Sequence, residues 1–281
     1  MDPTSDNSID PANDLDNNPR YIILPEFRSR FLPDARDIFL YLPEAYLTEP
    51  HRRFPVFYLH DGQNLFDPRR SFIPGHTWRA NTTADTLTAA GLISPVILVG
   101  VANTGVQRMP EYTPDRDPRL GGGEGPLYAK LLIEDLKPKI DADYRTRPDP
   151  FNTALGGSSL GGLISLAIGL QYPNIFGKLA VISPSVWWND RSLLRLVSNT
   201  NPRPDLRIWL DMGMSEGLHH LRDTDLLHSR LLHRGWRDGV DLAYLRVPGA
   251  QHNEDAWAAR FGQALQFLFP SQNHTSTMPN P

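Results

Sequence analysis

The chain has 281 residues, of which 40% are hydrophobic and 10% aromatic, so it can bury a sizeable core. Its formal net charge of −4 gives no electrostatic reason to expect a nucleic acid or an anionic membrane as its partner. It contains no cysteine, which excludes disulfides, thiolate metal sites and a cysteine nucleophile. No apolar run approaches the roughly 20 residues that a membrane-spanning helix needs.

Both ends of the chain are polar. Residues 1–20, MDPTSDNSIDPANDLDNNPR, are rich in Asn and Asp, and residues 271–281 are similarly polar, so we expect both segments to be disordered. The first segment lacks the basic and apolar parts of a signal peptide, which makes the cytoplasm the default expectation for its location. We therefore expect a single folded domain over residues 21–270.

Short apolar segments, bounded by Gly, Pro and Asp, are predicted as eight strands. A short polar link joins the first two, as in an antiparallel pair. From the third onward the segments are almost continuously apolar, which is typical of parallel strands buried on both faces. The eight segments are 21–27, 36–46, 54–62, 95–103, 151–157, 178–185, 206–213 and 241–249.

Helical patterns alternate with these strands. The alternation predicts an α/β fold with an eight-stranded, mostly parallel sheet and helices on both faces. Pro138 is expected to kink or end the first helix. Residues 104–125 are predicted as a long loop, and loops of that length in a compact domain are often functional. The predicted helices are 128–144, 159–173, 218–235 and 254–269.

Residues 157–161, GSSLG, match the pattern G-x-S-x-G with Ser159 at its centre. The pattern describes a strained turn between a strand and a helix that presents a nucleophilic serine above the edge of a sheet, and the flanking glycines give that turn room. A predicted strand precedes this segment and a predicted helix follows it. A phosphate-binding P-loop would need Gly-Lys-Ser/Thr, which is absent here. We therefore predict Ser159 as a nucleophile and Ser158 as a residue that only supports the turn.

A nucleophilic serine needs a general base, and the base needs an acid that orients it. In this fold the partners follow in the chain order serine, acid, histidine. His252 comes just after the last predicted strand and is the candidate base. The acid should follow the seventh strand, where Glu216 is preferred because it lies beyond the turn, and Asp211 at the strand end is the alternative.

The negative charge that develops on an attacked carbonyl needs two backbone N–H donors. The candidates are Leu160, directly after the nucleophile, and Gln63, in the loop HDGQN after the third strand. His60 at the end of that strand is expected to be structural. Four further histidines share one predicted helix without metal-ligand spacing and are expected on a solvated face: His219, His220, His228 and His233. We expect no metal and no cofactor.

Five segments in the same order resemble the putative esterase family of α/β-hydrolases: YLHDGQNLFD, EDLKPKIDADYRT, GGSSLGGLISL, SPSVWW and GAQHNEDAW. The resemblance covers about residues 36–268. That family includes feruloyl and acetyl esterases acting on plant polysaccharides, S-formylglutathione hydrolases, enterobactin-type siderophore esterases and mycolyltransferases. In its members the acid lies in a G-T-x-D/E turn, so the segment GMSE implies Glu216 rather than Asp211, with Met214 where the family has Thr.

The resemblance implies a serine carboxylic-ester hydrolase that acts, without cofactor, on acetyl, feruloyl or other short or aromatic acyl esters of sugars. The alternatives are a ferric-siderophore esterase, an acyltransferase that uses the same triad, and a non-catalytic binding protein, which the intact triad positions disfavour. We expect a small-molecule or carbohydrate ester as the partner, and neither nucleic acid nor membrane. The candidate substrate contacts are an aromatic platform and two polar side chains: Trp78, Trp187, Trp188, Trp257, Asn64 and Arg108.

Overall fold

The computed structural model describes residues 15–271, so the disorder expected for residues 1–14 and 272–281 lies outside the described part of the chain. Residues 15–20 differ from the expectation for the whole N-terminal segment. Leu15 begins a short 3₁₀-helix, η2 (Leu15–Asn17), and its side chain is buried in the core. Arg20 forms an ion pair with Asp85 at 2.7 Å. The folded part of the chain therefore begins before residue 21.

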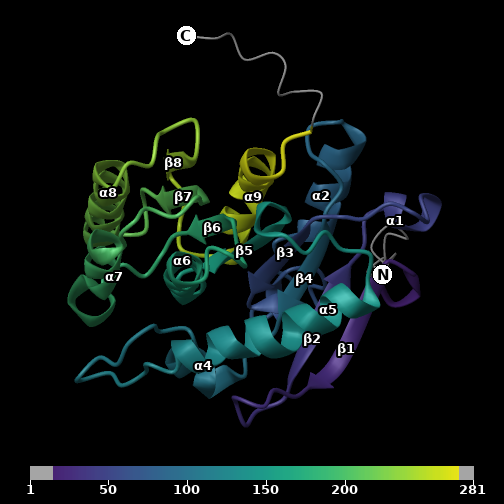
Figure 1. The fold of residues 1–281 in the computed structure, drawn as a ribbon, viewed down its shortest axis with the longest axis horizontal. Helices are drawn as coiled ribbons and strands as arrows, with labels where there is room; N and C mark the ends of the chain where they lie inside the picture. Colours follow the sequence, from purple (N-terminus) through teal and green to yellow (C-terminus); the bar gives the residue numbers. More distant parts are fainter. Residues whose placement is uncertain (1–14, 272–281) are drawn as a thin grey trace, which may run out of the picture.

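The eight predicted strands are confirmed and form one sheet in the order β1-β2-β4-β3-β5-β6-β7-β8 (Figure 1). The β1–β2 and β2–β4 pairs are antiparallel, and all the other pairs are parallel. Most strands are a few residues shorter than predicted, because the flanking apolar residues belong to turns. The strands are β1 (Tyr21–Phe27), β2 (Arg36–Tyr41), β3 (Val56–His60), β4 (Ile97–Val101), β5 (Thr153–Ser158), β6 (Lys178–Ile182), β7 (Arg207–Gly213) and β8 (Leu242–Val247).

The helices include all four that the sequence predicts, together with two of ten or more residues, α2 and α7, that it does not. The buried residues of α2 are only Ala80, Asn81 and Ala84, so α2 has no strong apolar stripe. The α-helices are α1 (Ala45–Thr48), α2 (Ala80–Ala89), α3 (Arg108–Glu111), α4 (Gly125–Lys130), α5 (Lys137–Asp143), α6 (Leu160–Gln171), α7 (Trp188–Asn199), α8 (Leu218–His233) and α9 (Glu254–Leu268).

Helices cover both faces of the sheet, and the core forms two layers. Alternate residues of β3 enter opposite layers: Val56 and Tyr58 face one, while Phe57 and Leu59 face the other. Helices α2 and α9 pack in the second layer, and α4 to α8 pack in the first (Figure 1). This two-sided burial explains why the central strands are almost continuously apolar.

The predicted helix over residues 128–144 is continuous but irregular. It consists of α4, a π-helical segment η5 (Leu131–Leu136) and α5, with Pro138 near the start of α5. Since proline has no N–H and crowds the preceding turn, the widened π turn lets the helix pass this residue without ending.

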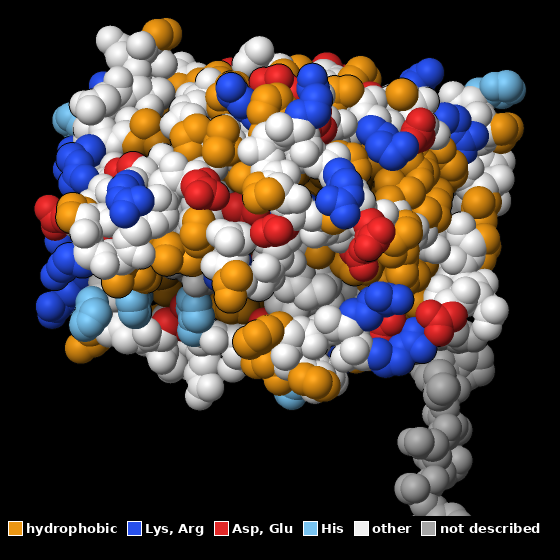
Figure 2. Space-filling model, turned by 90° about the horizontal axis from the view of Figure 1, so that it is seen from below, with side chains coloured by type: hydrophobic (Ala, Val, Ile, Leu, Met, Phe, Trp, Pro, Cys, Tyr) orange, Lys and Arg blue, Asp and Glu red, His pale blue; other side chains and the backbone are white. Residues whose placement is uncertain are grey.

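The surface carries mixed charge. On the face shown in Figure 2, basic and acidic side chains alternate among apolar ones and no field of a single sign dominates. Among the helices of residues 15–271, none has both the length and the apolar character needed to cross a membrane.

Candidate active site

Ser159 lies in a sharp turn between β5 and α6. Its backbone has φ 61° and ψ −121°, a conformation that costs a non-glycine residue free energy and occurs mostly at functional sites. Backbone hydrogen bonds to the end of β6 and the segment after it hold this turn in place. Ser159 N donates to Ile182 O at 3.0 Å, and Ser159 O accepts from Ser185 N at 3.0 Å. The strand–turn–helix geometry expected from the GSSLG pattern is therefore present.

The glycines of the pattern leave room for His60. A Cβ added at Gly157 would lie 3.0 Å from His60 Cβ, and one at Gly161 would lie 3.3 Å from the same atom. His60 is buried, and its Nδ1 lies 2.9 Å from the Tyr128 hydroxyl. Burial lowers the pKa of His60 to about 3, so the ring is neutral. His60 thus forms a packed, uncharged support beneath the turn.

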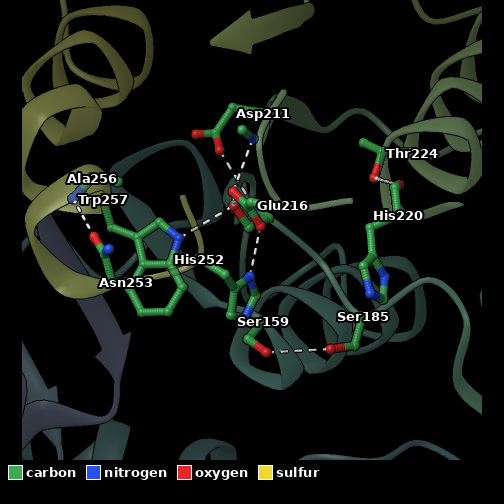
Figure 3. A network of polar contacts seen from close by, with 12 residues as sticks. Ser159, Ser185, Asp211, Glu216, His220, Thr224, His252, Asn253, Ala256 and Trp257 are labelled. Carbon is green, nitrogen blue, oxygen red and sulfur yellow. Dashed lines mark hydrogen bonds and ion pairs between the residues drawn. The ribbon is translucent and has the colours of Figure 1, made fainter. Parts of the chain in front are cut away.

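The two serines of the pattern differ in exposure. Ser158 ends β5, is 4% exposed and borders only one of two cavities at this turn, whereas Ser159 lines both cavities. The Ser159 hydroxyl lies 3.3 Å from Ser185 Oγ, and Figure 3 shows it directly beside His252. No hydrogen bond joins Ser159 to His252 within residues 15–271, so a proton transfer between them requires a rotation of one side chain. Catalytic hydrogen bonds are often incomplete before substrate binds.

Glu216 and His252 are joined across the loops after β7 and β8. His252 Nδ1 lies 2.6 Å from Glu216 Oε2, and in Figure 3 the imidazole lies between Glu216 and Ser159. The Glu216 side chain is almost fully buried, while the side chain of His252 is 45% exposed. Burial by itself would raise the pKa of Glu216, but the hydrogen bonds from His252 and Ser183 lower it below its ordinary value. Glu216 is therefore ionised and paired with the imidazole.

Asp211, the alternative acid, has other partners. It is fully buried, accepts from Arg260 Nε at 2.8 Å and from Trp209 Nε1 at 2.7 Å, and does not contact His252. Arg260 also lies 3.2 Å from Glu216 Oε1, so it bridges the two carboxylates. The structure pairs the imidazole with Glu216, the acid that the sequence favours.

The loop after β3 faces the same turn from the other side. Asp61 has φ 56°, and the next residues form the 3₁₀-helix η3 (Gly62–Asn64). Burial alone would raise the pKa of Asp61, but Arg108, which donates to it from Nε at 2.7 Å and Nη2 at 2.8 Å, lowers it.

The candidate oxyanion donors are the N–H groups of Gln63 in η3 and of Leu160, the first residue of α6. Neither N–H has an acceptor inside its own helix. Both remain predicted donors.

Two cavities meet at Ser159 and His252. The first has a volume of about 350 Å³ and is lined in part by Pro184, Trp187 and Met212. The second has a volume of about 410 Å³. Phe72 and Trp257 line it together with polar and charged side chains: Asp61, Gln63, Asn64, Asn103, Arg108, Ser158 and Glu254. A bound ester could place its two halves in the two cavities, with its carbonyl carbon at Ser159.

The aromatic platform predicted from four tryptophans does not form. Trp78 is 2% exposed and packs on Trp257 and Phe261, while Trp188 is 1% exposed and donates from Nε1 to Asp115 O. Both belong to the core, because their segments turn inward after leaving the sheet. Trp187 and Trp257 line one cavity each.

The two predicted polar substrate contacts, Asn64 and Arg108, already have partners within the protein. Asn64 lines the second cavity, but its amide bonds Glu254, Ser71 and Phe72 N. The charge of Arg108 is neutralised by Asp61, so it is not a free cation for an anionic substrate.

Three neighbouring residues escape sequence analysis. His220 lines the first cavity, although its helix was expected on a solvated face, and Ser183 and Arg260 both bond Glu216. No motif marks them, although Ser183 begins the segment SPSVWW. Within residues 15–271 no three His, Asp or Glu side chains are grouped to hold a metal ion.

Comparisons with known proteins agree with this fold. The family described as "Putative esterase" matches residues 29–268. Ferri-bacillibactin esterase BesA of Bacillus subtilis is 28% identical over 68% of this chain and 70% of its own, and the uncharacterized protein YbbA of the same organism is 27% identical over 84% and 93%. The crystal structure of the BES protein from Bacillus cereus, 22% identical, superposes with a TM-score of 0.70 over 90% of this chain and 95% of that one. The chain therefore belongs to the putative esterase family and is a carboxylic-ester hydrolase with an α/β-hydrolase fold.

Proposed function

We propose that Ser159, His252 and Glu216 are the catalytic triad of this esterase. The observation that carries the proposal is the 2.6 Å contact between Glu216 and His252 beside a serine held at φ 61° where two cavities meet. A strained serine, a partly exposed imidazole and a buried carboxylate together meet the requirements of an activated nucleophile.

In this proposal Ser159 Oγ attacks the ester carbonyl carbon and His252 Nε2 takes its proton. His252 then passes the proton to the leaving alkoxide, and a water activated by the same imidazole releases the acyl group. Glu216 holds His252 Nδ1 protonated and stabilises the imidazolium. The N–H groups of Gln63 and Leu160 bind the oxyanion, where each donor typically contributes about 3 kcal/mol to transition-state stabilisation.

Both cavities combine apolar walls with polar side chains, so each can hold a part of an ester substrate. Pro184, Trp187 and Met212 would accommodate a short or aromatic acyl group in the first cavity. In the second cavity, the Gln63 side-chain amide, whose Oε1 accepts from Asn103 N, would donate from Nε2 to a hydroxyl-rich alcohol such as a sugar. We therefore propose acetyl, feruloyl or related short acyl esters of sugars as the substrate class.

A ferric-siderophore ester is the second candidate, because BesA, a relative over 68% of this chain, is named as a ferri-bacillibactin esterase. Such a substrate is strongly anionic and would require basic side chains beside Ser159. Arg108, the basic side chain that lines the second cavity, is already paired with Asp61. The ion pair between Arg108 and Asp61 therefore favours a neutral sugar ester over an anionic siderophore ester as the substrate.

The triad is tested with Ser159→Ala, using Ser158→Ala as the matched control and p-nitrophenyl acetate as the substrate. We expect Ser159→Ala to lose at least about 1,000-fold in kcat. Ser158 borders the second cavity but is only 4% exposed, so its alanine variant should show only a small change in kcat. Wild-type turnover by Ser159→Ala would overturn the assignment.

The substrate class is tested with a panel of acetyl-sugar, feruloyl-sugar, short-chain acyl and ferric-siderophore esters. The proposal expects the highest kcat/KM for one of the sugar esters. A preference for the ferric siderophore would support the second candidate, and transfer of the acyl group to an added sugar would indicate an acyltransferase.

A further inference from the structure

A cavity of about 540 Å³ opens at the edge of the sheet opposite to Ser159, where β6 and β7 begin. Lys178 is the first residue of β6, and its register partner Arg207 is the first residue of β7. Ser159 lies at the opposite end of these strands. It comes directly after the last residue of β5, which runs parallel to β6, whereas the cavity lies where β6 and β7 begin. The cavity is thus separate from the cavities beside the triad.

Lys178 lines this cavity without a carboxylate partner. Its side chain is 5% exposed, and its Nζ lies 4.4 Å from the ring centroid of Phe151 and 4.7 Å from that of Phe269. No oxygen within residues 15–271 accepts a hydrogen bond from Nζ. The ammonium group thus borders the cavity with no hydrogen-bond partner in the described protein, so a group that enters the cavity can accept its hydrogen bonds.

Arg207 adds a second cation that forms no ion pair, although Asp241 attracts it from a longer distance. Its Nε donates to Phe267 O at 2.7 Å and its Nη1 donates to Val240 O at 2.9 Å. Both acceptors are backbone carbonyls, which satisfy the hydrogen bonds of the guanidinium and leave its positive charge in place. Lys178 and Arg207 therefore form a pair of like charges at the wall of one cavity.

The other charged groups at this cavity are largely engaged with one another. Asp241 accepts from Arg203 at 3.1 Å and lies 3.6 Å from Arg237. Asp149 accepts from Asn152 at 2.9 Å, and Asp205 is exposed at the rim. No carboxylate of the lining thus binds either Lys178 or Arg207 directly.

We propose that this cavity binds a small anion, a carboxylate or phosphate group, whose oxygens complete the hydrogen bonds of Lys178 and whose charge balances Lys178 and Arg207. The cavity is large enough for a ligand of several heavy atoms. Phe151, which is 73% exposed and lines the cavity, would contact the apolar body of an organic acid. The proposal does not depend on the assignment of the triad.

The protonation of Lys178 provides a signature of this site. Burial and then the charge of Arg207 lower the pKa of Lys178 to about 8, while the nearby carboxylate of Asp149 acts in the opposite direction. The free protein therefore holds the cation at pH 7 and loses it above pH 8. Because an anion binds the cationic form, its affinity should fall as the pH rises through this pKa.

The first test measures Tm with increasing inorganic phosphate or benzoate at constant ionic strength, with chloride as the replaced salt. A ligand that binds the folded state raises Tm with its concentration. We expect this rise in the wild type, in Lys178→Arg and in the exposed-lysine control Lys139→Met, and its loss in Lys178→Met. Methionine should pack against the two phenylalanine rings, so Lys178→Met is expected to fold with an unliganded Tm equal to or above that of the wild type.

The second test measures the benzoate Kd by calorimetry at pH 7 and pH 9.5. From the pKa of about 8, we expect affinity to weaken by about 30-fold. No anion-dependent Tm rise in the wild type, or an equal rise in Lys178→Met, would overturn the proposal. Hydrolysis of p-nitrophenyl acetate by Lys178→Met should equal that of the wild type, so a failure of this site is distinguishable from a failure of the triad.

Discussion

Ser183 Oγ donates a hydrogen bond to Glu216 Oε1 at 2.6 Å, on the side of the carboxylate that faces away from His252. The same hydroxyl accepts from Trp257 Nε1 at 3.2 Å, and the Trp257 ring packs edge-on against His252. Gly213 N also donates to Oε1 at 2.9 Å. One oxygen of Glu216 is thus held by the protein interior, which leaves the other free to orient the imidazole.

Ser183→Ala tests this positioning role. Loss of a hydrogen bond to a charged group costs about 1.5–3 kcal/mol, so we expect kcat to fall by about tenfold or more with little change in KM. Since the bond from Ser183 helps to lower the pKa of Glu216, the acid limb of the kcat/KM profile should move to higher pH. Steady-state kinetics with p-nitrophenyl acetate across pH measures both effects.

Ser185→Ala is the matched control, because Ser185 Oγ contacts Ser159 Oγ and not Glu216. Its acid limb should coincide with that of the wild type. If the two variants shift the profile equally, Ser183 has no specific effect on the carboxylate.

Arg260 joins the triad region to the core, and its loss should be costly. The side chains of Arg260 and Asp211 are 2% and 0% exposed and lie 2.8 Å apart. Arg260→Met would leave a buried aspartate unpaired, so we expect the free energy of unfolding to fall by about 3–5 kcal/mol in urea denaturation. Adding Asp211→Asn should recover part of that loss by removing the unpaired charge.

The control for Arg260 is Arg195→Met. Arg195 and Asp190 are exposed and lie 4.0 Å apart, so removal of this pair should change the unfolding free energy by less than about 1 kcal/mol. If Arg260→Met destabilises the protein no more than Arg195→Met, the buried pair is not a stabilising link.

His60 makes the stability depend on pH. Its pKa is lowered by burial to about 3 in the folded chain, against 6.5 for the unperturbed residue, so the unfolded chain binds a proton first as the pH falls. The associated stability is present above pH 6.5 and is lost as the pH falls toward 3. Between pH 6.5 and pH 4 it amounts to about 3 kcal/mol.

Comparison of His60→Gln with His51→Gln isolates this contribution, because His51 is exposed. Urea unfolding at a series of pH values should show a shallower acid destabilisation in His60→Gln, whereas His51→Gln follows the wild type. Parallel curves for all three proteins would show that His60 is protonated to the same extent in the folded and unfolded states.

The sheet could be predicted from the sequence because its central strands are buried on both faces and are almost continuously apolar. Helices α2 and α7 could not, since their buried positions include polar residues such as Asn81 and Ser192. The positions of Ser159, Glu216 and His252 follow from a local motif and from chain order. The roles of Ser183 and Arg260 depend on contacts between β6, β7 and α9, which no local pattern encodes.

The tryptophans show the same limit. Trp187 and Trp188 are adjacent and are the same type of residue. Yet Trp187 is 40% exposed at a cavity, whereas Trp188 is 1% exposed. The difference arises where the chain turns into α7 and Trp188 Nε1 meets Asp115 O. Since Asp115 belongs to a loop over seventy residues earlier, only the tertiary structure separates the two roles.

The turn that carries Gln63 gives the last prediction. A Cβ on Gly62 would lie 2.4 Å from the backbone carbon of Gly100, and backbone atoms cannot move aside as a flexible side chain can. Gly62→Ala should therefore displace η3 and the Gln63 N–H that we propose for the oxyanion. Because one such donor contributes about 100- to 1,000-fold to kcat, we expect a loss of that order.

Gly262→Ala on α9 is the control for this prediction. The nearest neighbour of the added Cβ would be Thr83 Cγ2 at 3.3 Å, and alanine favours the helix. Circular dichroism and urea unfolding would establish that Gly62→Ala remains folded at the assay temperature. A folded Gly62→Ala with wild-type kcat would show that the position of the η3 turn does not contribute to stabilisation of the oxyanion.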